Sequence, residues 1–216
     1  IPAALVTELP PRLLFQPTLE SFRQVVKYHP ILRYVANSLL TAVLATALAL
    51  AIGLPAAYAL TRFRFWGKSF LSLGVLCVYV MPPIAMVLPL YVIFSSVGLG
   101  GRLLALVFAH TLITFPLVIW LLRGFLVKIP VELEEAAMID GCGRLEALIR
   151  VVIPILAPGL SATTILAFLY SWNDFLYASI LTSRGTGTLP IMISGFITDK
   201  AVYWDRIAAS GSLVLL

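Results

Sequence analysis

The sequence predicts an all-α protein, a polytopic bundle of helices that cross a membrane. Apolar residues make up 61% of the 216-residue chain and charged residues only 12%, against roughly 45–50% and 25% in a soluble domain. Four stretches without a charged side chain reach the about 20 residues that a membrane-spanning helix needs. These stretches are 34–60, 69–101, 103–122 and 151–173. The composition argues against a soluble enzyme, a disordered segment and a nucleic-acid-binding module.

Each charge-free stretch is expected to form one full spanning helix. The four predicted spans cover residues 34–60, 69–95, 103–125 and 155–181. The last stretch, 207–216, is apolar but too short to cross a bilayer, so we expect the first half of a fifth span there. The chain starts at Ile1 without a signal peptide, and we expect a fragment that also lacks a helix at its front.

Residues 1–33 precede the first span and are treated as a separate external segment. Prolines mark residues 1–17 as extended, and Thr18 suits the N-cap of a short helix over 18–28. The apolar side chains of this helix share one face; they are Leu19, Phe22, Val25 and Val26. Such an amphipathic helix suits a membrane surface or a partner subunit.

Basic residues in the loops indicate the orientation, because cytoplasmic loops carry most of the Lys and Arg of a membrane protein. The first loop contains Arg62, Arg64 and Lys68, whereas the second contains only Arg102. The third loop, 126–154, is again basic. We therefore expect the first and third loops to be cytoplasmic, although the segment before the first span also carries basic residues.

A pair of prolines interrupts the second predicted span. Pro82 and Pro83 lie near its middle, and each removes a backbone donor from the helix. Inside a membrane, a bend is tolerated where neighbouring helices or water satisfy the freed carbonyls. The bend serves either helix packing or the shaping of a pathway.

The third loop, 126–154, predicts two short helices that meet at a glycine. Pro130 suits the first turn of the first helix, and three glutamates follow it near the positive end of the helix dipole. Gly141 is expected to end this helix in a left-handed conformation, which glycine adopts at little cost. Ala136 and Ala137 allow close approach, so the hairpin either docks into a partner's groove or covers the bundle.

This loop resembles the EAA loop of permease subunits of binding-protein-dependent ABC importers. The matching residues are Glu135, Ala136, Ala137, Asp140 and Gly141. Cys142 stands where the family usually has alanine, and Leu148 where an aromatic residue is common. The rest of the chain resembles the carbohydrate-uptake branch, of the maltose and glycerol-phosphate type. Its matches include the corner at 56–67, the W-N-D-F box at 172–175 and the T-L-P run at 188–190.

The resemblance implies a permease subunit in a bacterial inner (plasma) membrane that imports a sugar by alternating access. The EAA residues would couple it to a dimer of cytoplasmic ABC ATPase subunits, which would use ATP and Mg. No cofactor is expected in this chain. A second permease subunit, usually a different chain, would complete the path, an external sugar-binding protein would deliver substrate, and membrane lipid would surround the bundle.

Polar and aromatic residues within the spans are candidates for the translocation path. They are Tyr79, Tyr91, Trp172, Asn173 and Asp174. An intramembrane carboxylate costs several kcal/mol at mid-depth unless it is paired or hydrated, and Asp174 is alternatively a polar clamp between helices. We expect water or the second subunit to satisfy it, and we expect His110 to be an interhelical hydrogen-bond partner.

Motifs for catalysis or metal binding do not occur in the sequence. It contains no HExxH, no CxxC pair and no phosphate-binding loop, so ATP hydrolysis is expected in a partner subunit. Cys77 and Cys142 form no readable disulfide framework. The alternatives are an importer permease for another solute, such as a polyamine or phosphate, and a non-ABC channel.

Overall fold

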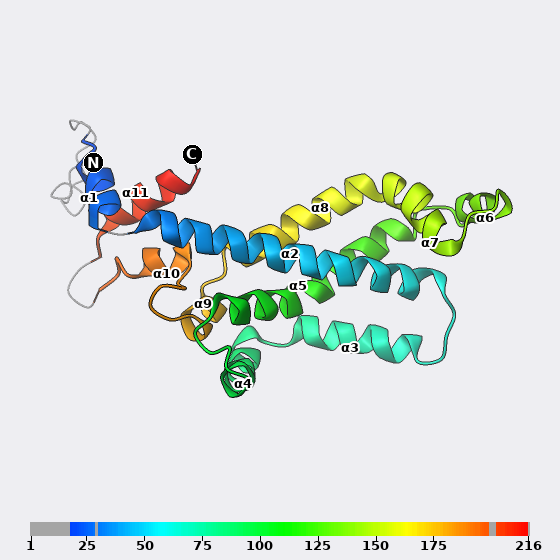
Figure 1. Ribbon diagram of the computed structural model, residues 1–216, viewed down its shortest axis with the longest axis horizontal. Helices are drawn as coiled ribbons and strands as arrows, with labels where there is room; N and C mark the ends of the chain where they lie inside the picture. The colour runs from blue at the N-terminus through cyan, green and yellow to red at the C-terminus, as the bar shows by residue number, and fades with distance from the viewer. Residues whose placement is uncertain (1–17, 29, 199–201, 216) are drawn as a thin grey trace, which may run out of the picture.

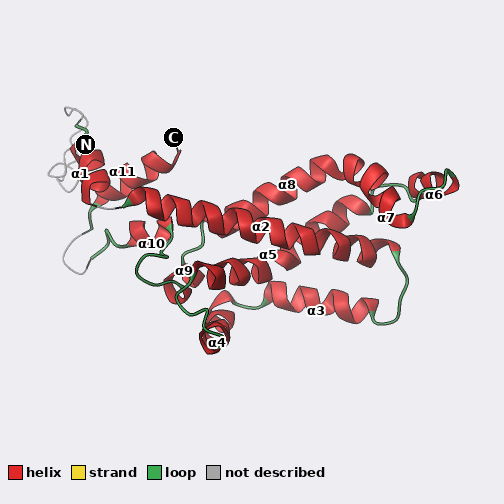
Figure 2. Cartoon of the chain, viewed as in Figure 1, coloured by secondary structure: helices red, strands yellow, loops and turns green. Residues whose placement is uncertain are grey.

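The computed structural model describes residues 18–28, 30–198 and 202–215, so the extended segment expected over 1–17 lies outside the described residues. These residues form helices joined by loops (Figure 2). The helices are α1 Glu20–Tyr28, α2 Ile31–Arg62, α3 Lys68–Val80, α4 Pro83–Ser96, α5 Leu103–Leu126, α6 Glu132–Ile139, α7 Arg144–Ala147, α8 Ile153–Trp172, α9 Leu176–Leu181, α10 Leu189–Ser194 and α11 Trp204–Leu215. A π-helical turn, Leu148–Val152, joins α7 to α8.

Three long helices form the centre of the molecule. Helix α2 lies along α5, and α8 packs against both (Figure 1). The main apolar core lies among them and includes Ala57 and Leu60 of α2, Leu122 of α5 and Leu156 of α8. Small residues bring the helices close together, as is common in membrane bundles. A Cβ atom on Gly53 of α2 would lie 2.6 Å from Cγ1 of Val118 on α5.

Three continuous helical stretches are long and apolar enough to cross a membrane: Ile31–Arg62, Leu103–Leu126 and Arg144–Trp172. The pair of α3 and α4 is a fourth candidate only if the two are counted as one broken span. The first and third predicted spans therefore correspond to α2 and α5. Helix α11 contains most of the predicted partial span at 207–216 and starts a few residues earlier.

The second predicted span, 69–95, is wrong as a single helix. It consists of α3 and α4, whose axes differ by 99°. Met81 and Pro82 between them are extended, with ψ angles of 131° and 128°. Each precedes a proline, and a residue in that position avoids helical ψ values. Pro83 then starts α4 at a position where its missing donor costs nothing.

The fourth predicted span, 155–181, is also interrupted. Helix α8 ends at Trp172, and α9 begins only at Leu176. On the other side, the π-helical turn extends α8 back to α7 without a break, so the helical stretch starts at Arg144. The sequence thus predicts the position of this helix but not the break at residues 173–175.

The short helix expected over 18–28 is α1, and it packs within this chain. Its Val25 is fully buried in a cluster that includes Leu189 and Ala209, while Leu19 and Val26 remain exposed. Helix α1 lies against α11. Its apolar face is therefore covered in part by this chain rather than by a membrane surface or another subunit alone.

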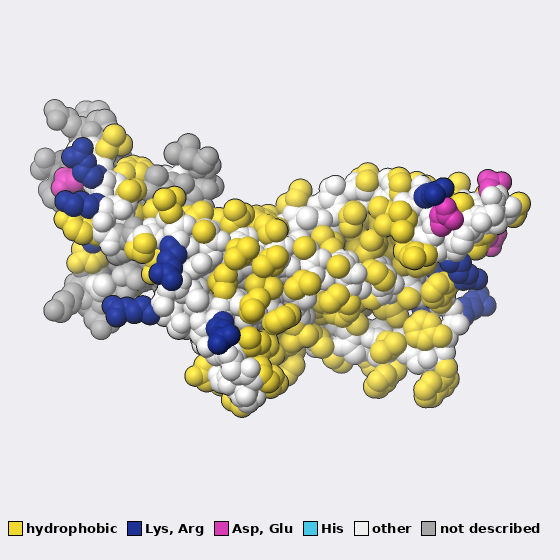
Figure 3. All heavy atoms as spheres, viewed as in Figure 1, with side chains coloured by type: hydrophobic (Ala, Val, Ile, Leu, Met, Phe, Trp, Pro, Cys, Tyr) yellow, Lys and Arg dark blue, Asp and Glu magenta, His cyan; other side chains and the backbone are white. Residues whose placement is uncertain are grey.

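The two ends of the elongated molecule differ in their elements. Helices α6 and α7 and the corner between α2 and α3 lie at one end, here called the α6 end (Figure 1). Helices α1, α10 and α11 lie at the opposite end, here called the α1 end. Charged side chains gather at both ends of the visible face, and apolar side chains dominate the middle (Figure 3). This distribution fits a bundle whose middle faces lipid.

Candidate functional site

The turn after α6 is built around Gly141. This residue has a φ angle of +95°, as the sequence predicts for a left-handed helix end. The Gly141 amide donates to the carbonyl of Met138 at 3.1 Å, and the Cys142 amide donates to the carbonyl of Ala137 at 3.0 Å. These two bonds form a Schellman motif, which satisfies the last carbonyls of the helix. The turn points the chain from α6 into α7.

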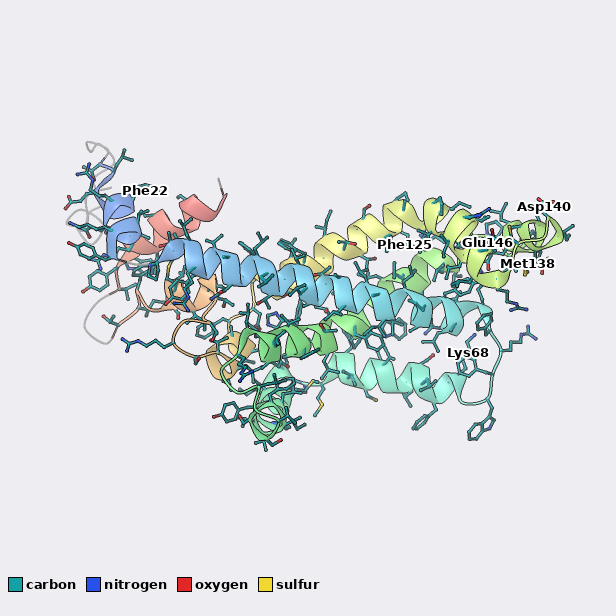
Figure 4. All side chains as sticks on the ribbon, in the orientation of Figure 1. Phe22, Lys68, Phe125, Met138, Asp140 and Glu146 are labelled. Carbon is teal, nitrogen blue, oxygen red and sulfur yellow. The ribbon has the colours of Figure 1, made fainter. Side chains whose placement is uncertain are left out.

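One face of α6 is open to solvent. Four of the five residues that match the EAA loop are exposed, and the fifth is half-buried; the exposed ones are Glu135, Ala136, Asp140 and Gly141. Ile139 beside them is 87% exposed. Met138 and Asp140 lie at the tip of the α6 end, with Glu146 nearby on α7 (Figure 4). An exposed surface that combines small, apolar and acidic side chains on a short helix suits insertion into a groove.

Glu134, on the other side of α6, is a residue whose role the sequence does not reveal. Its Oε1 accepts a hydrogen bond from Nε of Arg62 at 2.6 Å, and its Oε2 accepts one from the hydroxyl of Tyr58 at 2.6 Å. Arg62 Nη2 also donates to the carbonyl of Ile129 at 2.7 Å. The sequence pattern indicates only that Glu134 is one of three glutamates near the positive end of the helix dipole. Its pairing with α2 requires the tertiary structure.

A cavity of about 520 Å³, the corner cavity, separates α6 and α7 from the loop between α2 and α3. Its charged lining residues are Arg62, Arg64, Lys68, Glu134, Glu135 and Arg144. The guanidinium of Arg144 lies 5.3 Å from the ring centroid of Phe63, and Lys68 donates to the Phe63 carbonyl. Helix α6 thus contacts the end of α2 through Glu134, and α7 contacts the residue that follows α2 through Arg144.

Inside the bundle, His110 of α5 joins two polar residues near the end of α8. Its Nδ1 lies 2.6 Å from Oγ of Ser171, and its Nε2 lies 3.1 Å from Oδ2 of Asp174. In the tautomer that carries its proton on Nε2, the imidazole donates to Asp174 and accepts from the Ser171 hydroxyl, so one neutral ring can bond both residues. The interhelical role expected for His110 is confirmed.

The expectation that only water or a second subunit satisfies Asp174 is wrong. Besides His110, the amide of Ala178 donates to the same oxygen at 3.1 Å. The described spans contain no Lys or Arg near Asp174, and the partner is a histidine from another helix. His110 and Asp174 are 64 positions apart, and the local pattern of the sequence does not show that they meet.

Two cavities lie beside this network and share Leu117 and Tyr170 in their linings. The smaller, of about 210 Å³, lies at the bend between α3 and α4 and includes Tyr79. The larger, of about 650 Å³, includes Asn173 and Asp174. The structure thus brings three of the five sequence-predicted path residues to adjoining cavities, with Tyr170 as an addition that the sequence pattern did not single out.

Trp172 and Tyr91 lie away from these two cavities. Trp172 packs against the cluster around Val25 and stacks on Phe168 with ring centroids 5.7 Å apart. Tyr91 on α4 is 45% exposed and is not in the lining of either cavity. Within the described residues, no group of three or more His, Cys, Asp or Glu side chains is placed to hold a metal ion.

Most of the chain matches one known family of membrane proteins. Residues 49–215 match the model of the binding-protein-dependent transport system inner membrane component. The chain belongs to this family of permeases. It is an inner-membrane component of an ABC transport system, and the EAA residues on α6 lie within the matched range.

Curated relatives of the permease cover nearly the whole chain. The diacetylchitobiose uptake system permease protein DasC of Streptomyces coelicolor is 34% identical over 91% of this chain and 71% of its own length. The trehalose/maltose transport system permease protein MalG of Thermococcus litoralis is 33% identical over 93% of this chain and 73% of its own length.

The fold of the permease also has a match among solved structures. A chain from the crystal structure of a bacterial ABC transporter involved in the import of the acidic polysaccharide alginate aligns with a TM-score of 0.76. The alignment covers 98% of this chain and 79% of that chain, at 20% sequence identity. The overall fold of this chain is therefore shared with a chain of a solved ABC transporter.

Proposed function

We propose that this chain is a transmembrane permease subunit of an ATP-driven importer that carries a sugar by alternating access. The family assignment supports the permease role. Two similar relatives are named for the uptake of diacetylchitobiose and of trehalose or maltose, which supports a carbohydrate substrate. Membership of this family argues against a non-ABC channel. No observation favours a polyamine or phosphate over a sugar as the solute.

The exposed face of α6 is the observation that carries this function. A short helix that projects from the bundle, ends in a Schellman turn and exposes Glu135, Ala136, Asp140 and Gly141 has the form of a coupling helix. This helix would sit in a groove of a cytoplasmic ABC ATPase. The ATPase dimer would bind ATP and Mg, so this chain would supply no catalytic group.

The arrangement of the ends supports the orientation. The two loops that are expected to be cytoplasmic both lie at the α6 end, and α1 lies at the opposite end (Figure 1). We place the ATPase at the α6 end and the external sugar-binding protein at the α1 end. In this topology α2, the α3–α4 pair, α5 and α8–α9 are the four spans, and α11 begins a fifth.

The translocation path is proposed to run along the two adjoining cavities. Tyr79 and Tyr170 offer aromatic faces for sugar rings, and Asn173 and Asp174 offer groups that bond hydroxyls. Helix α3 has no buried residue within this chain, which fits a helix that faces a second permease subunit. Trp172 and Tyr91 contribute less directly to the path in this arrangement.

Co-purification tests the proposed function. The full-length chain is expressed with the ATPase and second permease encoded beside it, and ATP hydrolysis is measured with and without a sugar-loaded binding protein. We expect a stable complex whose hydrolysis rate rises with the loaded protein, and the sugar that produces the rise identifies the substrate. Absence of any association with an ATPase would contradict the function.

A further inference from the structure

The ion pair between Arg62 of α2 and Glu134 of α6 is buried, whereas the nearby pair between Glu146 and Arg150 is exposed. The side chains of Arg62 and Glu134 are only 9% and 5% exposed, whereas those of Arg150 and Glu146 are 71% and 40% exposed. An exposed pair contributes little, because water screens both charges. A buried pair resists separation, because the charge that is left behind loses its charged partner where little water can replace it.

The contacts of Glu134 fix the direction of α6 as well as its position. Tyr58 and Arg62 are four residues apart, so they share one face of α2, and they bind different oxygens of one carboxylate. The bond from Arg62 to the Ile129 carbonyl holds the chain just before α6. Both carboxylate oxygens of Glu134 are bonded to α2, and the Ile129 carbonyl is bonded to it as well. Helix α6 therefore has little freedom to pivot against α2.

The opposite end of α2 is bonded to residues 185–187 and to the first residue of α10. The side-chain amide Nδ2 of Asn37 donates to the backbone carbonyls of Gly185 and Gly187 at 3.2 and 2.9 Å. The Leu189 amide donates to Oγ of Ser38 at 2.8 Å. At 1.5 Å per residue, the part of α2 from Ser38 to Tyr58 separates these contacts from those of Glu134 by about 30 Å.

The body of α2 between the two sets of contacts is continuous and tightly packed. It remains one helix although Pro55 lies within it. Gly53, half a turn earlier, lies so close to Val118 of α5 that a side chain does not fit there, and Ala57 after the proline is fully buried. Close packing of this kind transmits displacements rather than absorbing them.

We propose that the Arg62–Glu134 ion pair, together with Tyr58, is the joint through which a movement of α6 is passed to α2 and along α2 to residues 185–189. Arg62, Tyr58 and Glu134 are positioning residues, since they act by holding the coupling helix rather than by contacting solute or nucleotide. The inference rests on the proposed function, because it takes α6 as the surface that an ATPase moves.

The test uses the assembled importer with the variant Glu134→Gln, which keeps the shape of the side chain and removes its charge. Three quantities are measured: the amount of ATPase that co-purifies, the rate of ATP hydrolysis, and the number of solute molecules imported per ATP. We expect the complex to assemble and hydrolyse ATP, while solute imported per ATP falls at least tenfold. Arg62→Lys, which keeps the charge but loses the two-pronged contact, is expected to give a smaller loss.

The control variant Glu146→Gln lies on α7. It removes the charge that pairs with Arg150 at the surface. It is expected to import as much solute per ATP as the unchanged chain, which would show that loss of a carboxylate from this loop is not sufficient.

The outcomes separate the joint from the proposed function. Normal import per ATP with Glu134→Gln would overturn the joint, as would loss of the complex with both Glu134→Gln and Arg62→Lys, since the pair would then serve assembly alone. If only Glu134→Gln fails to assemble, Arg62→Lys decides through the same ratio of import to hydrolysis. Failure of the unchanged chain to associate with any ATPase would instead contradict the proposed function.

Discussion

Nε2 of His110 lies 3.1 Å from Oδ2 of Asp174, and this contact fastens α5 to the break between α8 and α9. The same carboxylate oxygen accepts a hydrogen bond from the backbone amide of Ala178, in the first turn of α9. Ser171 completes the network on the other ring nitrogen. A polar group that is costly at membrane depth is thus paired within this chain, and it also borders the larger of the two adjoining cavities.

Asp174→Asn is expected to reduce transport more than assembly. The asparagine oxygen can still accept from Ala178, so the break keeps its shape, but the negative charge beside the cavity is lost. Transport by reconstituted complex and the yield of complex are measured together. His110→Ala leaves the buried Ser171 hydroxyl without its histidine partner and removes one of the two donors to Asp174. At a cost on the order of 2 kcal/mol for the unsatisfied hydroxyl, it should reduce yield more. A loss of complex with Asp174→Asn, without a separate effect on transport, would favour a purely structural clamp.

Gly141→Val is expected to uncouple ATP hydrolysis from uptake. A side chain at a φ angle of +95° is strained by about 1–2 kcal/mol or more, and valine relieves this strain by opening the Schellman turn. No atom lies within 4 Å of the Cβ position, so crowding is not the cause. Gly143→Ala is the matched control, because Gly143 has an ordinary φ of −70° and equally free space. Uptake per ATP equal to that of the unchanged chain with Gly141→Val would contradict the prediction.

Cys142 is expected to react with a membrane-impermeant thiol reagent only from the cytoplasmic side. It follows Gly141 at the α6 end and is half-buried, and Cys77 is exposed on α3. Labelling is compared between right-side-out and inside-out vesicles, and a Cys142→Ser variant identifies the contribution of Cys77. Labelling of Cys142 in right-side-out vesicles would reverse the orientation proposed for the two ends.

Gly53→Val is expected to destabilise the bundle by about 1–3 kcal/mol through overpacking. The new Cβ would lie 2.6 Å from the Val118 side chain, where α2 and α5 approach each other. The measurement is the thermal unfolding temperature of the detergent-solubilised complex. Gly74→Ala on α3 is the control, since no atom lies within 4 Å of its Cβ position. Equal unfolding temperatures for the two variants would show that the close approach is not needed.

The spans that the sequence predicts best are those whose limits are set by charge alone. The predicted ranges 34–60 and 103–125 differ from α2 and α5 by at most three residues at either end. Charged residues mark where these helices leave the apolar part of the bundle. The turn at Gly141 is equally readable, because the required backbone conformation selects glycine.

The features that the sequence did not reveal depend on which helices meet. Pro82 and Pro83 predict a bend, but the 99° angle depends on what α4 packs against. Glu134 and Arg62 are 72 positions apart, and nothing in either local pattern indicates that they form a pair. Likewise, Trp172 belongs to a motif that suggests a site, yet its ring turns into the cluster at the α1 end.

The bend after α3 has a consequence for the membrane around it. At 1.5 Å per residue, the 13 residues of α3 are about 20 Å long, whereas the hydrocarbon layer is about 30 Å thick. A helix this short creates hydrophobic mismatch, which a bilayer relieves by thinning locally or by yielding that side to another protein. Because α4 then runs across the bundle instead of continuing through it, polar groups at the bend can meet water at a depth where lipid would otherwise exclude it.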